Sequence, residues 1–530
     1  MKIKQDKKEK KKKEEKPEEG VSVEGLLEAL NLQQHKLQEN FGALDNYPLK
    51  PPFSYALIVQ DKNTSELSYF VDEIPMSREE QEASTELRKI LESRLQAPQE
   101  GESPAASFQR QFPDIVAECP RAMEGITSVG ARKISYYLER DVAGFGRIDP
   151  IMSDPNIEDI SCNGASKPVY LWHRKYENIR TNISFADEEE LDDFVMKLVH
   201  KAGKHISLAF PVVDATLPGK HRLAVYYKKE VTPLGTSFTI RKFREDPLTI
   251  IDLIQNETIS PELAAYLWLL VENKFSSMII GATGAGKTTS LNAVAGLVHP
   301  QHKIITVEEV SEINLLRENW VSTISRSGFG AESSGEVPLF DLIKAAVRHR
   351  PDWVIVGEVR GEEAYVLFQA LATGHGGLCT MHAEDAETAI KRLTQPPMNI
   401  PATIIPLMHC VVSVKHVKIP VLVEHARNVS KRKFMKVSEI RSSDSIHDVF
   451  VWDSSTDTYR EDIQNSYIFR QISEKWNLPF DYILKEFERR KTVLERLAEK
   501  NIRSCGGIAK FLTKFYSNPE LAYKEILESR

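Results

Sequence analysis

The chain has 530 residues, of which 41% are hydrophobic and 27% are charged. At roughly 100–200 residues per domain, this length predicts two to five domains, and the composition excludes a collagen-like or wholly disordered chain. Lys and Arg number 69 and Asp and Glu number 76, so the formal net charge is −7. This acidic balance argues against a protein that wraps nucleic acid with its whole surface, although a local basic patch stays open.

Membrane-spanning and secreted classes are also disfavoured. The longest apolar stretches, such as Leu263–Val271, are about half as long as a bilayer-spanning helix. Met1–Gly20 is charged where a secretory signal needs an apolar core, so we expect an intracellular protein. The five cysteines form no CxxC pair, which argues against a disulfide framework and a structural zinc site.

Charge and hydrophobic patterns divide the chain into six predicted parts. Residues 1–20 mix nine Lys with six acidic residues, which predicts a disordered tail or, alternatively, a weak contact with an anionic membrane. An amphipathic helix is predicted over Val21–Glu39, and a Pro-rich linker over Ala97–Ser107. The predicted parts are a tail (1–20), an α/β module with its linker (21–107), a mixed α/β domain (108–242), a hinge (243–250), an α/β core (251–415) and a mostly helical C-terminal extension (416–530).

A glycine-rich loop in the core carries the strongest chemical signal. It follows a short apolar strand, precedes a helix-forming run and matches GxxxxGK[ST]. Glycines let backbone N–H groups converge on phosphate oxygens, Lys287 reaches the β- and γ-phosphates, and Thr288 offers its hydroxyl to Mg²⁺. We therefore expect binding of ATP or GTP with Mg²⁺. The loop residues are Gly281, Ala282, Thr283, Gly284, Ala285, Gly286, Lys287, Thr288 and Thr289.

Two further apolar strands end in carboxylates. Residues 350–358 end in Glu358, which we expect to act on Mg²⁺ through water or to orient the attacking water. Residues 304–309 place Glu308 at a second strand end, where it would orient water or polarise a water ligand of the metal. The alternative for each is an ordinary acidic residue that follows a buried strand.

A second glycine-rich stretch, Gly374–Ala383, contains a short strand that ends in His382. This histidine is a candidate sensor of the γ-phosphate, although a lone histidine is more often structural. The chain has no HExxH motif and no Ser–His–Asp ordering, so we expect no protein-bound transition metal.

These elements, in this order and spacing, resemble the secretion-system and type IV pilus ATPases, that is, the GspE/PilB/PilT motors and their type IV secretion relatives. The likeness rests on the Walker A loop, an acidic box at Thr306–Glu312, a Walker B strand with Gly before Glu at Val354–Glu358, and a histidine box at Thr373–Ala383. It is greatest to the archaeal branch, which Tyr136–Gly164 resembles. The tetracysteine zinc loop usual in bacterial GspE proteins is missing from this chain.

The resemblance extends to arginines that act on the nucleotide, in places across a subunit boundary. Arg222 and Arg241 match such positions in the family's N-terminal domain, and Arg348 matches the arginine before the Walker B strand. A planar, permanently charged guanidinium suits charge that develops on a γ-phosphate. An ordinary surface or structural ion pair is the alternative for each arginine.

The resemblance implies a fold and a working cycle. The fold is α/β, with a RecA-like P-loop core, a PAS-like mixed α/β N-terminal domain and a helical C-terminal extension. The protein would be a cytoplasmic homohexamer, peripherally associated with the membrane, that hydrolyses ATP. It would drive assembly of a pilus-like or archaellum-like filament, or secretion, through a polytopic membrane partner, with neither nucleic acid nor stable zinc bound.

Two other functions stay open. One is a type IV secretion ATPase that transfers DNA or protein. The other is a nucleotide-gated scaffold without turnover, which the presence of Lys287, Glu308 and Glu358 disfavours.

Overall fold

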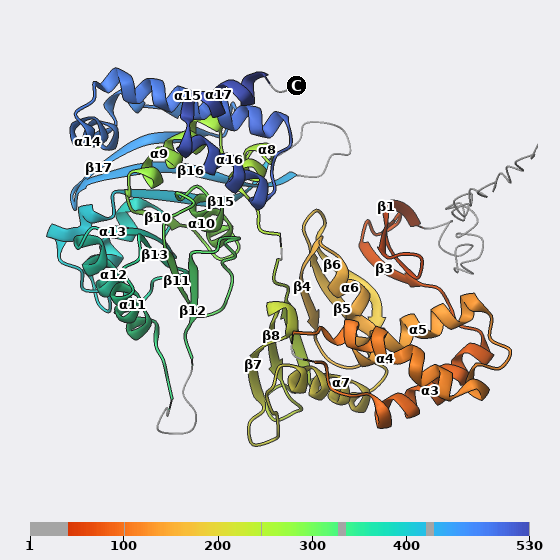
Figure 1. Cartoon of the computed structure of the whole chain (residues 1–530). Helices are drawn as coiled ribbons and strands as arrows, with labels where there is room; N and C mark the ends of the chain where they lie inside the picture. Colours follow the sequence, from red (N-terminus) through yellow and green to blue (C-terminus); the bar gives the residue numbers. More distant parts are fainter. Residues whose placement is uncertain (1–40, 100, 245, 327–334, 420–428, 529–530) are drawn as a thin grey trace, which may run out of the picture. The chain divides into compact units, whose positions relative to one another are not determined.

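The computed structural model describes residues 41–99, 101–244, 246–326, 335–419 and 429–528. The chain divides into two compact units, of which unit 1 ends at Phe243 and unit 2 begins at Arg244 (Figure 1). The tail predicted at 1–20 and the helix predicted at Val21–Glu39 lie outside the described residues.

Unit 1 is built on a nine-stranded sheet with the order β1-β2-β3-β6-β5-β4-β9-β8-β7. Neighbouring strands are antiparallel except for β3 and β6, which are parallel. Strands from the predicted 21–107 module therefore share one sheet with those of the predicted 108–242 domain. The strands are β1 (Phe41–Lys50), β2 (Ser54–Asp61), β3 (Leu67–Glu73), β4 (Ile157–Cys162), β5 (Pro168–His173), β6 (Glu177–Ser184), β7 (Val212–Thr216), β8 (Arg222–Tyr226) and β9 (Ser237–Arg241).

The helices of unit 1 belong to two apolar clusters. Leu87, Phe108 and Ile134 join α3, α4 and α5 in one cluster, and α7 packs on the sheet through residues such as Leu198. The described helix α4 begins inside the predicted linker, because Ser103 caps it and Pro104 occupies its first turn. The helices are α3 (Arg78–Arg94), α4 (Pro104–Glu118), α5 (Ser128–Val142), α6 (Asp149–Ser153) and α7 (Glu188–Lys201).

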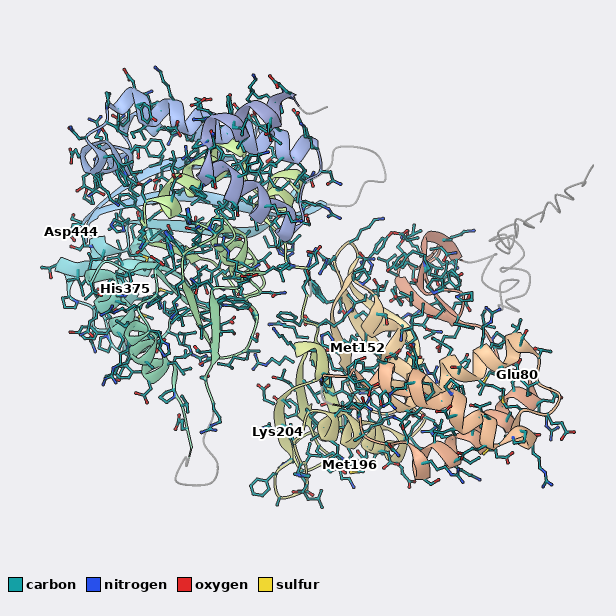
Figure 2. The ribbon with its side chains drawn as sticks, in the orientation of Figure 1. Glu80, Met152, Met196, Lys204, His375 and Asp444 are labelled. Atoms are coloured by element: carbon teal, nitrogen blue, oxygen red, sulfur yellow. The ribbon has the colours of Figure 1, made fainter. Side chains whose placement is uncertain are left out.

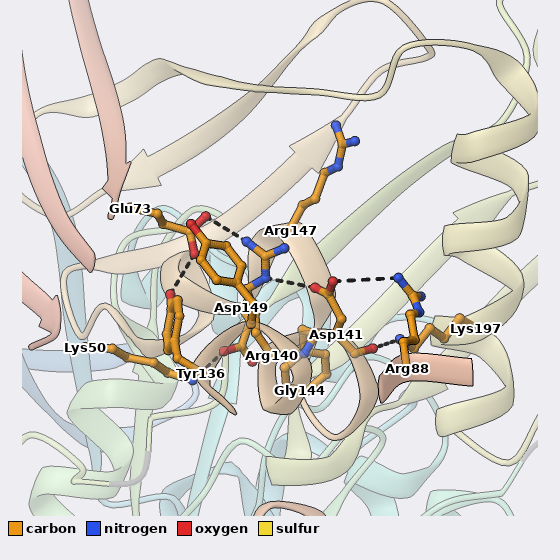
Figure 3. A network of polar contacts seen from close by, with 12 residues as sticks. Lys50, Glu73, Arg88, Tyr136, Arg140, Asp141, Gly144, Arg147, Asp149 and Lys197 are labelled. Atoms are coloured by element: carbon orange, nitrogen blue, oxygen red, sulfur yellow. Dashed lines mark hydrogen bonds and ion pairs between the residues drawn. The ribbon is translucent and has the colours of Figure 1, made fainter. Parts of the chain in front are cut away.

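A polar network fastens α5 to the end of β3 (Figure 3). The Tyr136 hydroxyl and the Arg140 guanidinium each donate to the Glu73 carboxylate, at 2.6 Å and 2.8 Å. Arg140 also donates to Asp141 at 2.8 Å. Burial alone would lower the pKa of Arg140, but the carboxylates of Glu73 and Asp141 raise it above its usual value. These contacts therefore join α5 to the end of β3.

Unit 2 is built on a second nine-stranded sheet with the order β12-β11-β13-β14-β10-β15-β16-β17-β18. The first six strands in this order are parallel, and β15 to β18 are joined as antiparallel neighbours. The strands are β10 (Ser277–Ile280), β11 (Ile304–Glu308), β12 (Trp320–Ile324), β13 (Trp353–Val356), β14 (Gly376–Met381), β15 (Cys410–Ile419), β16 (Val429–Ser442), β17 (Ser445–Asp453) and β18 (Thr458–Glu461).

Helices cover both faces of this sheet (Figure 1). Ile279 belongs to the cluster formed with α8–α10 and α14–α17, whereas Met278 and Ile280 belong to the cluster formed with α11–α13. Alternate residues of a strand point to opposite faces, so the two clusters flank the sheet. The helices are α8 (Ile250–Gln255), α9 (Pro261–Glu272), α10 (Lys287–Ala295), α11 (Leu339–Arg348), α12 (Glu363–Ala372), α13 (Ala386–Thr394), α14 (Tyr467–Trp476), α15 (Phe480–Glu499), α16 (Cys505–Ser517) and α17 (Pro519–Glu528).

The predicted fold class is confirmed. Strands β10, β13 and β14 are buried along their whole length, as parallel strands covered on both faces must be, and this is the arrangement of a RecA-like P-loop core. The helical extension is present as α14–α17, but strands β16–β18 precede it and widen the core sheet. None of the described helices is both long and apolar enough to cross a bilayer.

Candidate functional site

The loop between β10 and α10 turns tightly at the carboxyl end of β10, in the middle of the sheet. A Cβ on Gly281 would lie 2.3 Å from the Val414 carbonyl oxygen of β15, so only glycine lets the loop approach this strand. Gly286 starts α10 in the left-handed conformation at φ +97°. The loop therefore presents successive backbone N–H groups at the N-terminus of a buried helix, which is a geometry that attracts phosphate.

Lys287 is the first residue of α10, and only 8% of it is exposed. Its Nζ donates to the Ala282 carbonyl oxygen at 3.1 Å and lies 3.3 Å from Nδ1 of His382. Burial lowers the pKa of the Lys287 ammonium, and the nearby carboxylates of Glu358 and Glu312 oppose this shift. The side chain is thus held inside the loop, where its charge is available to an anion.

His382 and Glu358 meet beside this lysine. They follow β14 and β13, and the distance between His382 Nε2 and Glu358 Oε1 is 3.3 Å. Because parallel strands end at the same edge of a sheet, the carboxyl ends of β10, β13 and β14 bring Lys287, His382 and Glu358 together. The other histidine of the box, His375, which is labelled in Figure 2, precedes β14 and so lies at the end of that strand opposite His382.

The glycine before Glu358 has a structural reason. A Cβ on Gly357 would lie 3.2 Å from Cγ of Glu308, which ends the neighbouring strand β11. Only 2% of Glu308 is exposed, and its Oε1 accepts hydrogen bonds from the backbone N–H groups of Glu312 and Ile313 at 2.9 Å and 2.8 Å. The Glu308 carboxylate therefore folds the loop after β11 back against the strand.

The predicted arginines occupy two different places. Arg222 and Arg241 lie in unit 1, where they are opposite each other in the register of β8 and β9. Arg222 Nε donates to Asp214 Oδ1, and Arg241 Nε donates to Asp159 Oδ1, both at 3.2 Å. Arg348 is the exposed last residue of α11 in unit 2.

Several polar residues around the loop and helix α10 were not predicted from the sequence. Arg360 pairs with Glu309, which lies in the acidic box. Arg317 donates to the carbonyl oxygens of Gly296 and His299, at 2.7 Å and 2.9 Å, just beyond the C-terminal end of α10. Another arginine, Arg432 of β16, donates from Nε to the Gly284 carbonyl oxygen of the loop at 3.4 Å. The acidic box signalled Glu309, but no sequence motif distinguishes the three arginines.

The residues at this site fit a nucleoside triphosphate with Mg²⁺. The glycine cradle, the helix N-terminus and the buried ammonium of Lys287 suit phosphate oxygens. Thr288, in the first turn of α10, and Glu358, whose side chain is 41% exposed, would supply the oxygen ligands that Mg²⁺ prefers. Among the described residues, no group of three or more His, Cys, Asp or Glu side chains is arranged to hold another metal.

Comparison with known proteins finds one matching family model and several proteins of similar sequence. A family model described as "Type II/IV secretion system protein" matches residues 142–478. An uncharacterised protein of Methanocaldococcus jannaschii is 36% identical over 401 residues, which cover 74% of this chain and 71% of that protein. The type IV secretion system protein PtlH of Bordetella pertussis is 28% identical over 280 residues, which cover 48% of this chain and 80% of PtlH.

A solved structure of the pilus retraction motor PilT with bound ADP covers 53% of this chain and 79% of PilT, at 18% identity and a TM-score of 0.38. The family model spans more than half of the 530 residues. The chain therefore belongs to the type II/IV secretion system protein family, within the superfamily of secretion ATPases.

Proposed function

We propose that this protein hydrolyses ATP and couples the reaction to assembly of a type IV pilus-like or archaellum-like filament, or to protein secretion, through a membrane partner. One observation carries the proposal: Lys287, His382 and Glu358 converge on the phosphate loop at the carboxyl ends of three parallel strands. These are a phosphate-binding cation, a carboxylate that can orient water, and a histidine that contacts both.

Each residue has a proposed part in turnover. The N–H groups of the loop and the Lys287 ammonium bind the β- and γ-phosphates, and Glu358 orients the water that attacks the γ-phosphorus. His382, which lies within 3.3 Å of both Lys287 and Glu358, responds to the presence of the γ-phosphate. Thr288 and, through water, Glu358 would hold Mg²⁺, which neutralises phosphate charge when bound.

The remaining predicted residues complete the site. Glu308 acts as a positioning residue, because it holds the loop after β11 through two backbone N–H groups. Arg222, Arg241 and Arg348 are proposed to neutralise charge on the γ-phosphate, some of them in the site of a neighbouring subunit. This arrangement requires a homo-oligomer, for which we propose a hexamer at the cytoplasmic face of the membrane, bound to a polytopic partner.

The likeness to PtlH favours a second candidate, an ATPase of a type IV secretion system. The two functions differ in what the membrane partner is. Crosslinking the protein in its host cell and identifying the captured membrane protein separates a filament platform from a type IV secretion channel.

A turnover assay tests the ATPase itself. Wild-type protein should release phosphate from ATP, Lys287→Ala should lose ATP binding, and Glu358→Gln should retain ATP binding while its turnover falls at least about a hundredfold. Lys510→Ala, on the exposed side of α16, serves as the control and should match the wild type. Normal hydrolysis by Glu358→Gln would overturn the role given to that carboxylate.

A further inference from the structure

The amino ends of the parallel strands in unit 2 form a basic edge, at the end of the sheet opposite the phosphate loop. Lys274 lies shortly before β10, while Lys303 and Asp352 directly precede β11 and β13. His375, labelled in Figure 2, marks the same end of β14. Lys274 Nζ donates to Asp352 Oδ1 at 2.7 Å, and the backbone N–H of Lys303 donates to Asp352 Oδ2 at 2.9 Å. One carboxylate therefore holds two lysines at this edge.

Asp352 does not balance the positive charge around it. Burial alone would raise its pKa, but the hydrogen bonds from Lys274 and Lys303 lower it below the usual value, so Asp352 stays ionised. Lys303 Nζ donates to the His349 carbonyl oxygen at 2.9 Å, and the exposed Arg350 follows that residue. Among the described residues, no carboxylate pairs with Arg350. An ammonium has three N–H donors, so each lysine keeps donors for an anion in solution.

The turn between α14 and α15 adds exposed aromatic side chains next to the basic edge. Lys475 Nζ and Trp476 Nε1 donate to the carbonyl and side-chain oxygens of Asn273, at 3.2 Å and 2.7 Å, and Asn273 directly precedes Lys274. Trp476 is nevertheless 58% exposed, and Tyr482, near the start of α15, is 46% exposed. The polar atom of the indole is thus satisfied inside the protein, while much of its apolar ring is in water.

We infer that the basic edge and the α14–α15 turn together bind the headgroup layer of an anionic lipid bilayer. Lysine and arginine side chains are attracted to an anionic lipid surface, and each charge adds to the affinity. Trp and Tyr rings favour the headgroup level, where the apolar body of the ring leaves water. The inference adds a lipid partner to the protein partner of the proposed function, and it does not depend on ATP turnover.

The surroundings of Trp476 favour lipid over nucleic acid as the anion. A nucleic acid would use the exposed indole as a platform for a stacked base. The Lys475 ammonium lies 5.6 Å from the ring centroid of Trp476 and competes with a base for the ring. When the ring enters the headgroup layer, the same ammonium lies at the level of the lipid phosphates, so the two side chains act together.

Co-sedimentation of the full chain with lipid vesicles, without nucleotide, tests the inference. Wild-type protein should bind vesicles of phosphatidylcholine with phosphatidylglycerol but not vesicles of phosphatidylcholine alone, and added salt should weaken the binding. The double variant Arg350→Glu, Lys475→Glu should bind the anionic vesicles at least about tenfold more weakly, because two attractive charges become repulsive. Trp476→Ala should weaken the same binding about threefold or more, because the ring no longer enters the headgroup layer.

A matched control separates a local surface from net charge. Lys89→Glu with Lys510→Glu makes the same change of net charge at exposed positions of α3 and α16, and should bind anionic vesicles like the wild type. Equal weakening by this pair, or full binding by the Arg350→Glu, Lys475→Glu variant, would overturn the inference.

Two further results would also overturn it. One is binding by the wild type that does not require phosphatidylglycerol. The other is a single-stranded oligonucleotide that the wild type binds through Arg350 and Lys475 while it leaves anionic vesicles unbound. ATP turnover without vesicles should be the same in the wild type and in these variants. Absence of turnover from the wild type would count against the proposed function and would leave the lipid result standing.

Discussion

Glu308 and Glu358 are carboxylates at the ends of adjacent strands, but their surroundings give them different roles. Glu308 is buried, and its Oε1 accepts hydrogen bonds from two backbone N–H groups. The side chain of Glu358 is instead 41% exposed and lies beside His382. The sequence predicted both as candidates, because each follows an apolar strand. The sequence could not show that the two carboxylates have different roles, because the contacts of Glu308 arise only when residues 309–313 fold back on the strand.

His409 illustrates how a buried neutral histidine supports the core of unit 2. Its Nδ1 accepts a hydrogen bond from the backbone N–H of Ser276, just before β10, at 3.2 Å. Burial lowers the pKa of His409 to about 4, and the charge of Lys475 adds to this effect. Protonation would remove the acceptor, so the folded protein binds this proton less readily than the unfolded chain.

We expect the free energy of unfolding to decrease as the pH falls from about 6.5 toward 4. The unfolded histidine, with a pKa near 6.5, takes up a proton over this window and the folded one does not, so the contribution of His409 is present above it and is lost below it. Between pH 7.5 and 5.5 the share of this loss that comes from His409 should be about 1 kcal/mol. Urea unfolding at the two pH values measures it, and His409→Asn, which retains an acceptor without titrating, should reduce it. An unchanged pH dependence in this variant would contradict the assignment.

The secondary-structure elements differ in how well the sequence reveals them. Strands β10 and β13 are predictable because they are short apolar runs buried on both faces, and the glycine motif identifies the turn after β10. Strand β16 is harder to predict, because it buries two charged residues. Lys433 is paired with Asp457, and Glu439 accepts hydrogen bonds from Tyr266 and Ser466. These partners are far away in the sequence, so the strand looks like a polar surface segment.

Helix α10 is held at its C-terminal end by a half-buried arginine. Arg317 donates to the carbonyl oxygens of Gly296 and His299, and burial lowers its pKa to about 10, so it keeps its charge at neutral pH. A cation at this end of a helix also complements the helix dipole. The residue thus fixes the helix whose opposite end forms the phosphate loop.

Arg317→Met should destabilise the protein by about 2–4 kcal/mol, because the carbonyl oxygens of Gly296 and His299 lose their donor while the side-chain length is kept. Arg317→Lys should recover part of this loss. Chemical denaturation measures both. Arg496→Met is the matched control, because its partner Glu499 lies on the same exposed helix surface and such pairs contribute little. An equal effect of the two methionine variants would show that Arg317 does not hold α10.

At the scale of the whole molecule, the proposed chemistry is divided between the two units. Unit 2 contains the phosphate loop, Glu358 and His382, whereas Arg222 and Arg241 stand on adjacent strands of unit 1. Hydrogen bonds fix both ends of the segment that connects the two units, at Phe243 and at Thr249. The backbone N–H of Phe243 donates to Nδ1 of His221 at 2.9 Å, and Thr249 caps α8. The sequence predicted only a hinge at 243–250, because the contact of His221 with Phe243 joins residues that no local pattern connects.

Mixing two inactive variants tests whether the arginines act across a subunit boundary. Arg241→Ala should bind ATP normally and lose turnover about a hundredfold or more, since an arginine that meets the γ-phosphate acts mainly in the transition state. Glu358→Gln should also be inactive.

In mixed oligomers, an Arg241→Ala subunit keeps Glu358 and its Glu358→Gln neighbour keeps Arg241, so an arginine that acts in trans would recreate intact sites. Phosphate release should then rise well above the sum of the separate variants after subunit exchange. Mixing Glu358→Gln with Lys287→Ala, both of which are defective in the phosphate-binding unit, should restore nothing. If Arg241 acts within its own subunit, the first mixture should remain as inactive as the second, and the proposed role across the boundary would be wrong.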